Sequence, residues 1–352
     1  MRLLWITPGF AANESDHNCI PPLQALARAL ARRGVELHII ALEYPFFPPS
    51  GQGHSPFGFE NLKLYPCNGQ NRRWLRWRTQ GRAIQQALQL ATPRRFDAVH
   101  SFWLGPAWIL GQQLAATWNT PHWCTLMGQD VLPRNWWYLR RLRPSHAGQL
   151  VALSAFQNDC LEKSAGFRAA HTIPWGLEAE AFTGQLPAER PPDILGVGSL
   201  IPVKNWPRWL KVLHLLAQQQ VPFRAELIGE GPERRRLQVL IEKYGLEKQV
   251  RLPGNLPRPE VLERMRNSRV LLHTAQYESF GMVLLEAAAS GCRVVSTPVG
   301  IAPELGRCAA TDPALVEELA QALLPASPAP SPLPSRFFLE EIARQYLSLY
   351  AP

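Results

Sequence analysis

Short runs of apolar residues alternate with stretches of helical periodicity through the first half of the chain. Residues 3–7 form an apolar run typical of a buried strand, and residues 22–33 place leucines and alanines at helical spacing before Gly34. The pattern predicts further strands over residues 35–41, 97–101, 122–126 and 150–153, and a helix over residues 106–118. Continuous apolar strands separated by helices indicate a parallel sheet covered on both faces.

A second alternation begins after a polar, proline-bearing segment at residues 184–192. It predicts strands over residues 193–197, 224–228, 250–252, 270–273 and 293–296, and helices over residues 206–219, 233–244, 258–267 and 281–290. We therefore predict an α/β fold of two doubly wound, Rossmann-like domains, residues 1–175 and 176–325, facing a cleft. In such folds, ligands bind at the carboxyl ends of the strands.

The end of the chain has a different pattern. Residues 325–334 read PASPAPSPLP, which predicts a stiff polyproline-type spacer of about 30 Å. An amphipathic helix over residues 336–350 follows it. We expect the segment 326–352 to leave the second domain and to pack on the first.

Composition and charge narrow the class of protein. With 46% hydrophobic and 18% charged residues, the chain can bury a large core, which excludes a disordered protein. The six cysteines are far apart and form no C-x-x-C pair, so a reduced, cytoplasmic compartment fits best. No signal-peptide pattern and no run of about 18 apolar residues is present, so we expect any membrane contact to be peripheral. The net charge of +9 favours a negatively charged partner.

The segment of residues 273–300 carries the most specific chemistry. A predicted strand is followed by a loop with Glu278, then by Gly281, where a helix begins, and by Glu286 inside that helix. The free backbone N–H groups at a helix start suit an anion, and a glycine lets a phosphate approach the backbone. Glu286 could accept hydrogen bonds from a ribose. The alternative is that both glutamates are ordinary surface carboxylates.

At this segment, the chain resembles the retaining "group 1" (family 4) glycosyltransferases of the GT-B fold, of the class that builds bacterial cell-surface glycans. The two glutamates, eight residues apart, are similar to the E-x7-E region of that family. Further resemblances lie in ILGVGSLIPVKN (194–205), AELIGEGP (225–232), VRLPGNLP (250–257), TIPWGLEAEAF (172–182) and the terminal FFLEEIARQYLSLY. The resemblance covers about residues 95–350.

The resemblance implies roles by matching position. Lys204 would neutralise a donor diphosphate as a compact cation, Glu286 would hold the ribose, and Glu278 would contact the donor sugar or the reacting centre. Other donor contacts are expected at Gly9, Ser199, Gly229, Leu256 (at the base), Phe280, Gly281, Met282 and Val283. No D-x-D pair occurs, which argues for metal-independent transfer without a cofactor, and UDP is expected as the nucleotide rather than GDP.

The first domain offers two further candidate catalytic residues. His100 matches a histidine often present in the family, and either lines the cleft or is a plain buried histidine. Asp130 either stabilises a turn or contacts the sugar or acceptor. Two departures stand out: Met127 replaces a usual histidine, and Ser199 stands where many relatives have an arginine. They leave open a second hypothesis, a catalytically weakened scaffold that binds a glycan or a partner.

Two basic segments of the first domain interleave arginine with tryptophan: NRRWLRWRTQGR (71–82) and RNWWYLRRLR (134–143). Such segments, from Arg72 to Arg82 and from Arg134 to Arg143, suit an anionic membrane surface. The alternative is two solvated helix faces with their tryptophans buried inward, and nucleic acid is disfavoured because no nucleic-acid module is readable. The combined hypothesis is an enzyme of cell-envelope polysaccharide biosynthesis. It would move a hexose-like sugar from a nucleotide diphosphate to a glycan or lipid-linked acceptor, in the cytoplasm or at the inner face of the plasma membrane.

Overall fold

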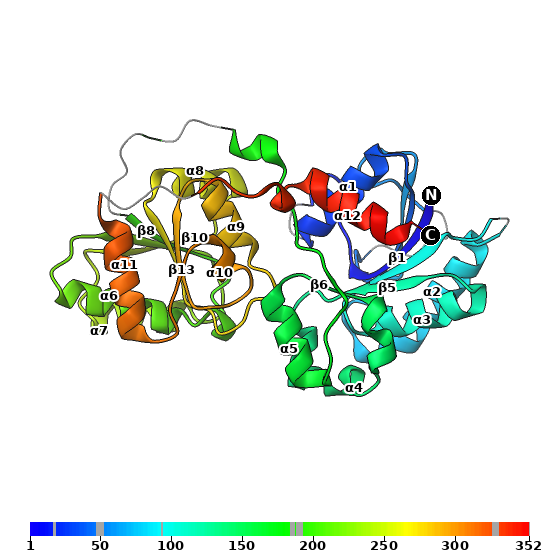
Figure 1. Ribbon diagram of the computed structural model, residues 1–352, viewed down its shortest axis with the longest axis horizontal. Helices are drawn as coiled ribbons and strands as arrows, with labels where there is room; N and C mark the ends of the chain where they lie inside the picture. The colour runs from blue at the N-terminus through cyan, green and yellow to red at the C-terminus, as the bar shows by residue number, and fades with distance from the viewer. Residues whose placement is uncertain are drawn as a thin grey trace. The chain divides into compact units, whose positions relative to one another are not determined.

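The computed structural model divides into two compact units (Figure 1). Unit 1 comprises Met1–Glu178 and Ser335–Pro352, and unit 2 comprises Ala179–Pro334. The structure describes residues 1–16, 19–46, 53–92, 94–183, 187, 193–325 and 331–351. Most of the linker 184–192, and residues 326–330 of the proline-rich spacer 325–334, therefore lie outside the described residues.

Unit 1 is built on a seven-stranded parallel sheet in the order β3-β2-β1-β4-β5-β6-β7. The strands are β1 (Arg2–Gly9), β2 (Glu36–Tyr44), β3 (Leu62–Pro66), β4 (Ala98–Phe102), β5 (His122–Thr125), β6 (Leu150–Ala152) and β7 (His171–Thr172). The helices are α1 (Pro21–Arg32), α2 (Arg76–Leu90), α3 (Pro106–Trp118), α4 (Trp136–Leu139), α5 (Ala155–Ala165) and α12 (Leu339–Tyr350).

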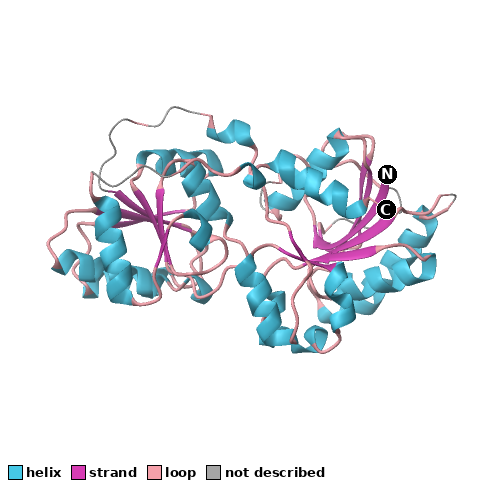
Figure 2. Ribbon diagram, viewed as in Figure 1, coloured by secondary structure: helices cyan, strands magenta, loops and turns pink. Residues whose placement is uncertain are grey.

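Unit 2 holds a six-stranded parallel sheet in the order β10-β9-β8-β11-β12-β13. The strands are β8 (Asp193–Val197), β9 (Arg224–Ile228), β10 (Val250–Gly254), β11 (Val270–His273), β12 (Arg293–Ser296) and β13 (Arg307–Cys308). The helices are α6 (Trp206–Gln218), α7 (Arg234–Lys243), α8 (Arg258–Asn267), α9 (Met282–Ala289), α10 (Ala302–Leu305) and α11 (Asp312–Leu323). Helices cover both faces of each sheet (Figure 2), so the predicted pair of doubly wound α/β units is confirmed.

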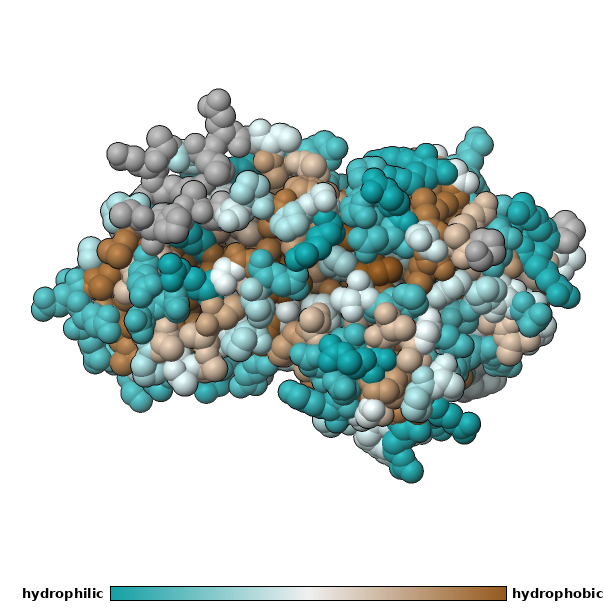
Figure 3. Space-filling model, viewed as in Figure 1, coloured by the Kyte–Doolittle hydropathy of each residue, from teal (hydrophilic) through white to brown (hydrophobic). Residues whose placement is uncertain are grey.

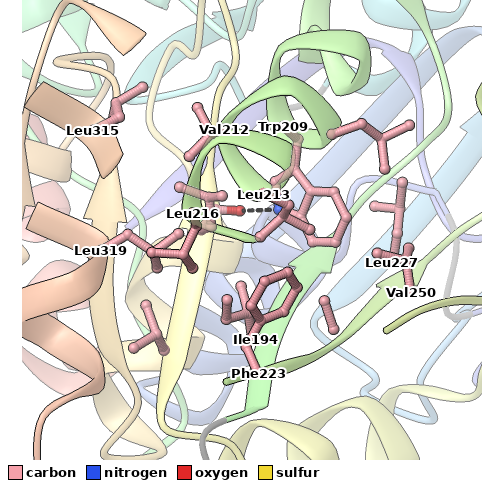
Figure 4. Close-up of a cluster of buried hydrophobic side chains, with 14 of the residues drawn as sticks. Ile194, Trp209, Val212, Leu213, Leu216, Phe223, Leu227, Val250, Leu315 and Leu319 are labelled. Atoms are coloured by element: carbon pink, nitrogen blue, oxygen red, sulfur yellow. Dashed lines mark hydrogen bonds between the residues drawn. The ribbon is translucent and has the colours of Figure 1, made fainter. Parts of the chain in front are cut away.

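The core of unit 2 shows why its apolar pattern forms this fold. Helix α6 presents Trp209, Leu213 and Leu216 from one face to the sheet and to α11, and all three side chains are buried (Figure 4). Burying each large apolar side chain contributes about 1.5–3 kcal/mol. The indole N–H of Trp209 donates to the carbonyl of Leu272 at 3.1 Å, so the buried polar atom is satisfied.

Helix α12 belongs to unit 1, as predicted for the last helix. The backbone amide of Leu177 donates to Phe337 O, and that of Leu339 donates to Leu177 O. The helix then buries Tyr346 and Tyr350 against the sheet of unit 1. This docking joins two parts of unit 1 that are far apart in the sequence.

The sequence pattern did not predict β3, α2, α5 and α11, nor the short elements α4, β7, α10 and β13. Helix α2 buries only Thr79, Ala83 and Ala87, so its apolar periodicity is weak. The segment 134–143, for which a helix face is one of the two alternatives, holds only short 3-10 and α turns. Among the described residues, no helix combines the length and the apolar character that a membrane span requires.

Candidate functional site

Strand order in unit 2 reverses between β8 and β11, which lie side by side. A ligand site is expected outside the carboxyl ends of the strands at such a switch point. The loop after β8 ends in a 3-10 turn at Lys204, and the loop after β11 carries Glu278. The two loops are joined, because Gln276 N donates to Val203 O at 2.9 Å and Thr274 Oγ1 donates to Asn205 O at 3.1 Å.

Lys204 and Glu278 meet at this switch point. The ammonium of Lys204 forms an ion pair with Oε1 of Glu278, and their side chains are only 18% and 15% exposed. Nε2 of His273, at the end of β11, lies 3.2 Å from the same oxygen. Burial alone would raise the pKa of Glu278, but His273 and Lys204 together lower it to about 2. Glu278 is therefore ionised at neutral pH.

Two glycines hold the loop after β8 against the loop after β9. A Cβ on Gly229 would lie 2.0 Å from Gly198 O, and a Cβ on Gly231 would lie 2.5 Å from Leu200 O. Both glycines also have positive φ angles, +146° and +155°, which other residues rarely adopt. The backbone of the loop that leads to Lys204 is fixed by this close approach.

Helix α9 begins at Met282, directly after Gly281 with φ +95°. The preceding Phe280 is buried, and its carbonyl accepts a hydrogen bond from Ile301 N at 2.9 Å, which fixes the helix start to the loop after β12. The first turn of a helix has backbone N–H groups without intrahelical partners, here beginning with Met282 and Val283. An anion near Lys204 would gain from these dipoles.

Glu286 lies one turn inside α9 and takes part in a separate ion pair. The guanidinium of Arg258, at the start of α8, donates to Glu286 Oε1 at 2.9 Å. The loop just before Arg258 contains Leu256, which is partly buried against the core between the sheet, α8 and α9. Glu286 and Arg258 thus form a second ion pair, with Leu256 two residues before Arg258 in the chain. No hydrogen bond or ion pair between the described residues joins Glu286 to Lys204.

Sequence reasoning missed His273 and Arg258. The signal for His273 was present, since it is the polar residue that ends an otherwise apolar strand, five residues before Glu278. Arg258 directly follows the segment 250–257 that resembles a base-binding loop. In both cases only the folded chain shows which glutamate the side chain contacts. Ser199, by contrast, is exposed on the loop after β8, and its carbonyl accepts from the indole of Trp206.

The structure favours the buried alternative for His100. This residue is fully buried on β4, and both ring nitrogens are engaged: Nε2 with Thr125 Oγ1 and Nδ1 with Tyr350 Oη, each at 2.8 Å. Burial holds the pKa of His100 well below its ordinary value, so the ring is neutral. His100 therefore anchors the C-terminal helix in the core, and a catalytic role does not fit its surroundings.

Asp130 is also buried, in the turn after β5. Its carboxylate accepts hydrogen bonds from the backbone amides of Leu104, Met127 and Gly128 at 2.9, 3.2 and 3.0 Å. Burial raises its pKa, and these amide bonds oppose the rise. The geometry favours the turn alternative over a contact to sugar or acceptor. Gly9 ends β1 at the switch point of the unit 1 sheet, where a Cβ would lie 3.2 Å from Cys19 Sγ.

Two family models match the chain, one on each side of residue 180. Residues 178–324 match "Glycosyl transferases group 1", and residues 23–181 match "Glycosyltransferase Family 4". The first match contains Lys204, Glu278 and Glu286, so the described site lies within it.

Curated relatives are similar over part of the chain. The gpi3 subunit of phosphatidylinositol N-acetylglucosaminyltransferase from Schizosaccharomyces pombe is 30% identical over 158 residues, 44% of this chain and 34% of that protein. WcaL of Escherichia coli, which is assigned to colanic acid biosynthesis as a glycosyltransferase, is 36% identical over 121 residues, 33% of this chain and 30% of that protein. The chain thus spans about a third of the length of these relatives.

The fold has solved counterparts. Anabaena HepE, crystallised with UDP and glucose, superposes with a TM-score of 0.66 at 16% identity, over 99% of this chain and 98% of that chain. This likeness shows the GT-B fold. Together with the two family models and the parallel α/β units, it identifies the chain as a member of the group 1 glycosyltransferases.

Proposed function

We propose that the chain transfers a hexose-like sugar from a nucleotide diphosphate donor to a glycan or lipid-linked acceptor, with retention of anomeric configuration and without a metal. The observation that carries the proposal is the Lys204–Glu278 pair at the switch point of unit 2, beside the start of α9. A partly buried lysine, paired with a glutamate on the loop that leads into α9, suits a diphosphate leaving group, whose developing charge needs stabilisation.

The pair also has a consequence for donor binding. In the free protein, the charge of Lys204 is balanced by Glu278, so a diphosphate would compete with this carboxylate for the ammonium. Glu278 keeps its contact with His273 and remains ionised. A carboxylate released from Lys204 could then face the donor sugar, where positive charge develops in the transition state.

Other parts of the proposal have their own support. Glu286 and Arg258, with Leu256 on the neighbouring loop, offer a carboxylate, a guanidinium and an apolar contact to a nucleoside. UDP is the favoured nucleotide, since HepE was solved with UDP. Unit 1 is proposed to receive the acceptor at the carboxyl ends of its strands. A role in cell-envelope polysaccharide synthesis, in the cytoplasm at the inner face of the membrane, is in keeping with the naming of WcaL.

The test is a panel of nucleotide sugars incubated with the purified protein in the presence of a chelator. We expect slow hydrolysis of one donor, and an α-linked donor should yield initially α-configured sugar by NMR. Failure of every donor to bind or react would favour the scaffold hypothesis that Met127 and Ser199 raised. If activity disappears with the chelator and returns with a divalent cation, the transfer depends on a metal. That result would contradict the proposed metal independence and leave the rest of the proposal standing.

A further inference from the structure

The two arginine–tryptophan segments of unit 1 lie close together in space. The first runs through a 3-10 turn (Arg73–Leu75) into the start of α2, and the second forms α4 and its flanking turns. Tyr138 on α4 lies within electrostatic reach of an arginine from each segment. Burial raises the pKa of Tyr138, and the guanidinium groups of Arg76 and Arg141 oppose this rise, so arginines from both segments act on one phenol. We call the two segments, residues 72–82 and 134–143, the arginine–tryptophan surface.

The tryptophans of this surface point into solvent. The exposed fractions are 64% for Trp74, 69% for Trp77, 55% for Trp136 and 44% for Trp137. This excludes the alternative in which they are buried inward beneath solvated helix faces. Four exposed indoles, on the 3-10 turn before α2, in the first turn of α2 and on α4, form an unusual amount of exposed apolar surface.

Each exposed indole is paired with a guanidinium. The distances from guanidinium carbon to ring centroid are 5.9 Å for Arg72–Trp74, 5.0 Å for Arg78–Trp77, 5.5 Å for Arg140–Trp136 and 3.3 Å for Arg141–Trp137. Such pairing holds a cation beside an amphipathic ring. Apolar and cationic groups are therefore presented together, as an interface between water and hydrocarbon requires.

The charge of the surface is not neutralised. No aspartate or glutamate occurs over residues 61–96 or 131–158. Arg72, Arg76, Arg78, Arg82, Arg134, Arg140, Arg141 and Arg143 are exposed. Within the described part of the chain, none of these eight has a carboxylate oxygen within 4.0 Å. A carboxylate does lie at the border, where Glu43 accepts from the amide of Asn71 at 2.8 Å. Around α4, the view in Figure 3 shows a surface rich in hydrophilic residues.

We propose that the arginine–tryptophan surface docks unit 1 on a bilayer of anionic lipids. The indoles enter the headgroup region, and the arginines bind lipid phosphates, each contributing about 1 kcal/mol near a negatively charged surface. Membrane docking does not depend on the proposed function. Its consequence does: if the chain is a glycosyltransferase with a lipid-linked acceptor, docking brings unit 1 to the membrane that holds this acceptor.

The test is sedimentation with vesicles of phosphatidylcholine alone or with about one third phosphatidylglycerol. We expect binding to the anionic vesicles only, weakened as salt rises from about 0.1 M to about 0.5 M. The double variant Arg76→Glu with Arg78→Glu should bind at least about tenfold more weakly, and Trp136→Ala with Trp137→Ala should also lose binding. A matched control, Arg235→Glu with Arg251→Glu on unit 2, makes the same change of net charge and should bind as the parent does.

Absence of binding to anionic vesicles, equal binding to neutral ones, or an equal loss in the unit 2 control would overturn the proposal. So would a single-stranded oligonucleotide that binds more tightly than the vesicles and displaces them, which would assign the surface to nucleic acid. Donor hydrolysis without lipid is measured on the same variants and should be unchanged. A failure of docking is thus distinguishable from a failure of the proposed transferase activity.

Discussion

Nε2 of His273 lies 3.2 Å from Oε1 of Glu278, and it approaches the carboxylate from the end of the strand that precedes the site. His273 is 1% exposed and packs edge-on against the ring of Trp206. It cannot reach a ligand itself, so we assign it as a positioning residue that holds Glu278 in place and keeps it ionised.

Replacing His273 should therefore shift the pH dependence of donor hydrolysis. In His273→Ala, Glu278 loses one of the contacts that lower its pKa, so this pKa should rise from about 2 toward the ordinary 4.5. The acid limb of the pH–rate profile for donor hydrolysis should shift upward by about one unit. In His273→Gln, whose side-chain amide can donate to the carboxylate, the acid limb should shift by less than in His273→Ala. A loss of rate with an unmoved profile would mean that His273 is only structural.

Glu278 should contribute to stability in a pH-dependent way. Its pKa is lowered from 4.5 to about 2 on folding, so its contribution is complete above pH 4.5 and is lost as pH falls toward 2. The full shift corresponds to about 3 kcal/mol. In urea unfolding, the difference between the parent and Glu278→Gln should be largest at neutral pH and should shrink at pH 3. Exposed Glu317→Gln serves as the control, and a difference independent of pH would refute the assignment.

Gly229 should not tolerate a side chain. In Gly229→Ala, the new Cβ would collide with Gly198 O, and its φ of +146° adds strain. We expect unit 2 to lose about 2–4 kcal/mol of stability and to bind donor more weakly, because the loop to Lys204 must shift. Gly81→Ala makes the same chemical change in α2 with nothing within 4 Å, and should be neutral or slightly stabilising. Equal melting temperatures for the two variants would contradict this account.

The structural role of His100 can be tested through its partner Tyr350. Tyr350→Phe removes the hydroxyl that bonds His100 Nδ1 and leaves a buried ring nitrogen without its partner, which should cost about 1–3 kcal/mol. Donor hydrolysis at a temperature where the variant is folded should be unchanged. Tyr244→Phe, whose ring is only partly buried, is the control for stability. If Tyr350→Phe lowered turnover without lowering the melting temperature, a catalytic role for His100 would be supported instead.

The strands and the two-unit architecture were predictable because the sheet strands are continuous apolar runs, as in residues 3–7 and 270–273. The sequence pattern does not predict strand β3 or helix α2, because their apolar periodicity is weak. Strand β3 contains Lys63, and helix α2 is mostly exposed. Lys204 and Glu278 are each predictable from the resemblance to the group 1 glycosyltransferases, but that resemblance does not show that they form a pair. Their ion pair joins residues 74 positions apart and follows from the order of strands β8 and β11, which no local pattern specifies.

The central claim is that Lys204 binds the diphosphate of a nucleotide-sugar donor. The most direct measurement is calorimetric titration of nucleotide sugars into the parent, into Lys204→Gln and into Lys248→Gln, which removes an exposed lysine elsewhere on unit 2. Circular dichroism at the titration temperature checks that all three proteins are folded. We predict that Lys204→Gln raises the dissociation constant of the preferred donor by at least about tenfold, since a charge-assisted contact is worth about 1.5–3 kcal/mol, while Lys248→Gln matches the parent. A folded Lys204→Gln protein that binds the donor as tightly as the parent would contradict the account.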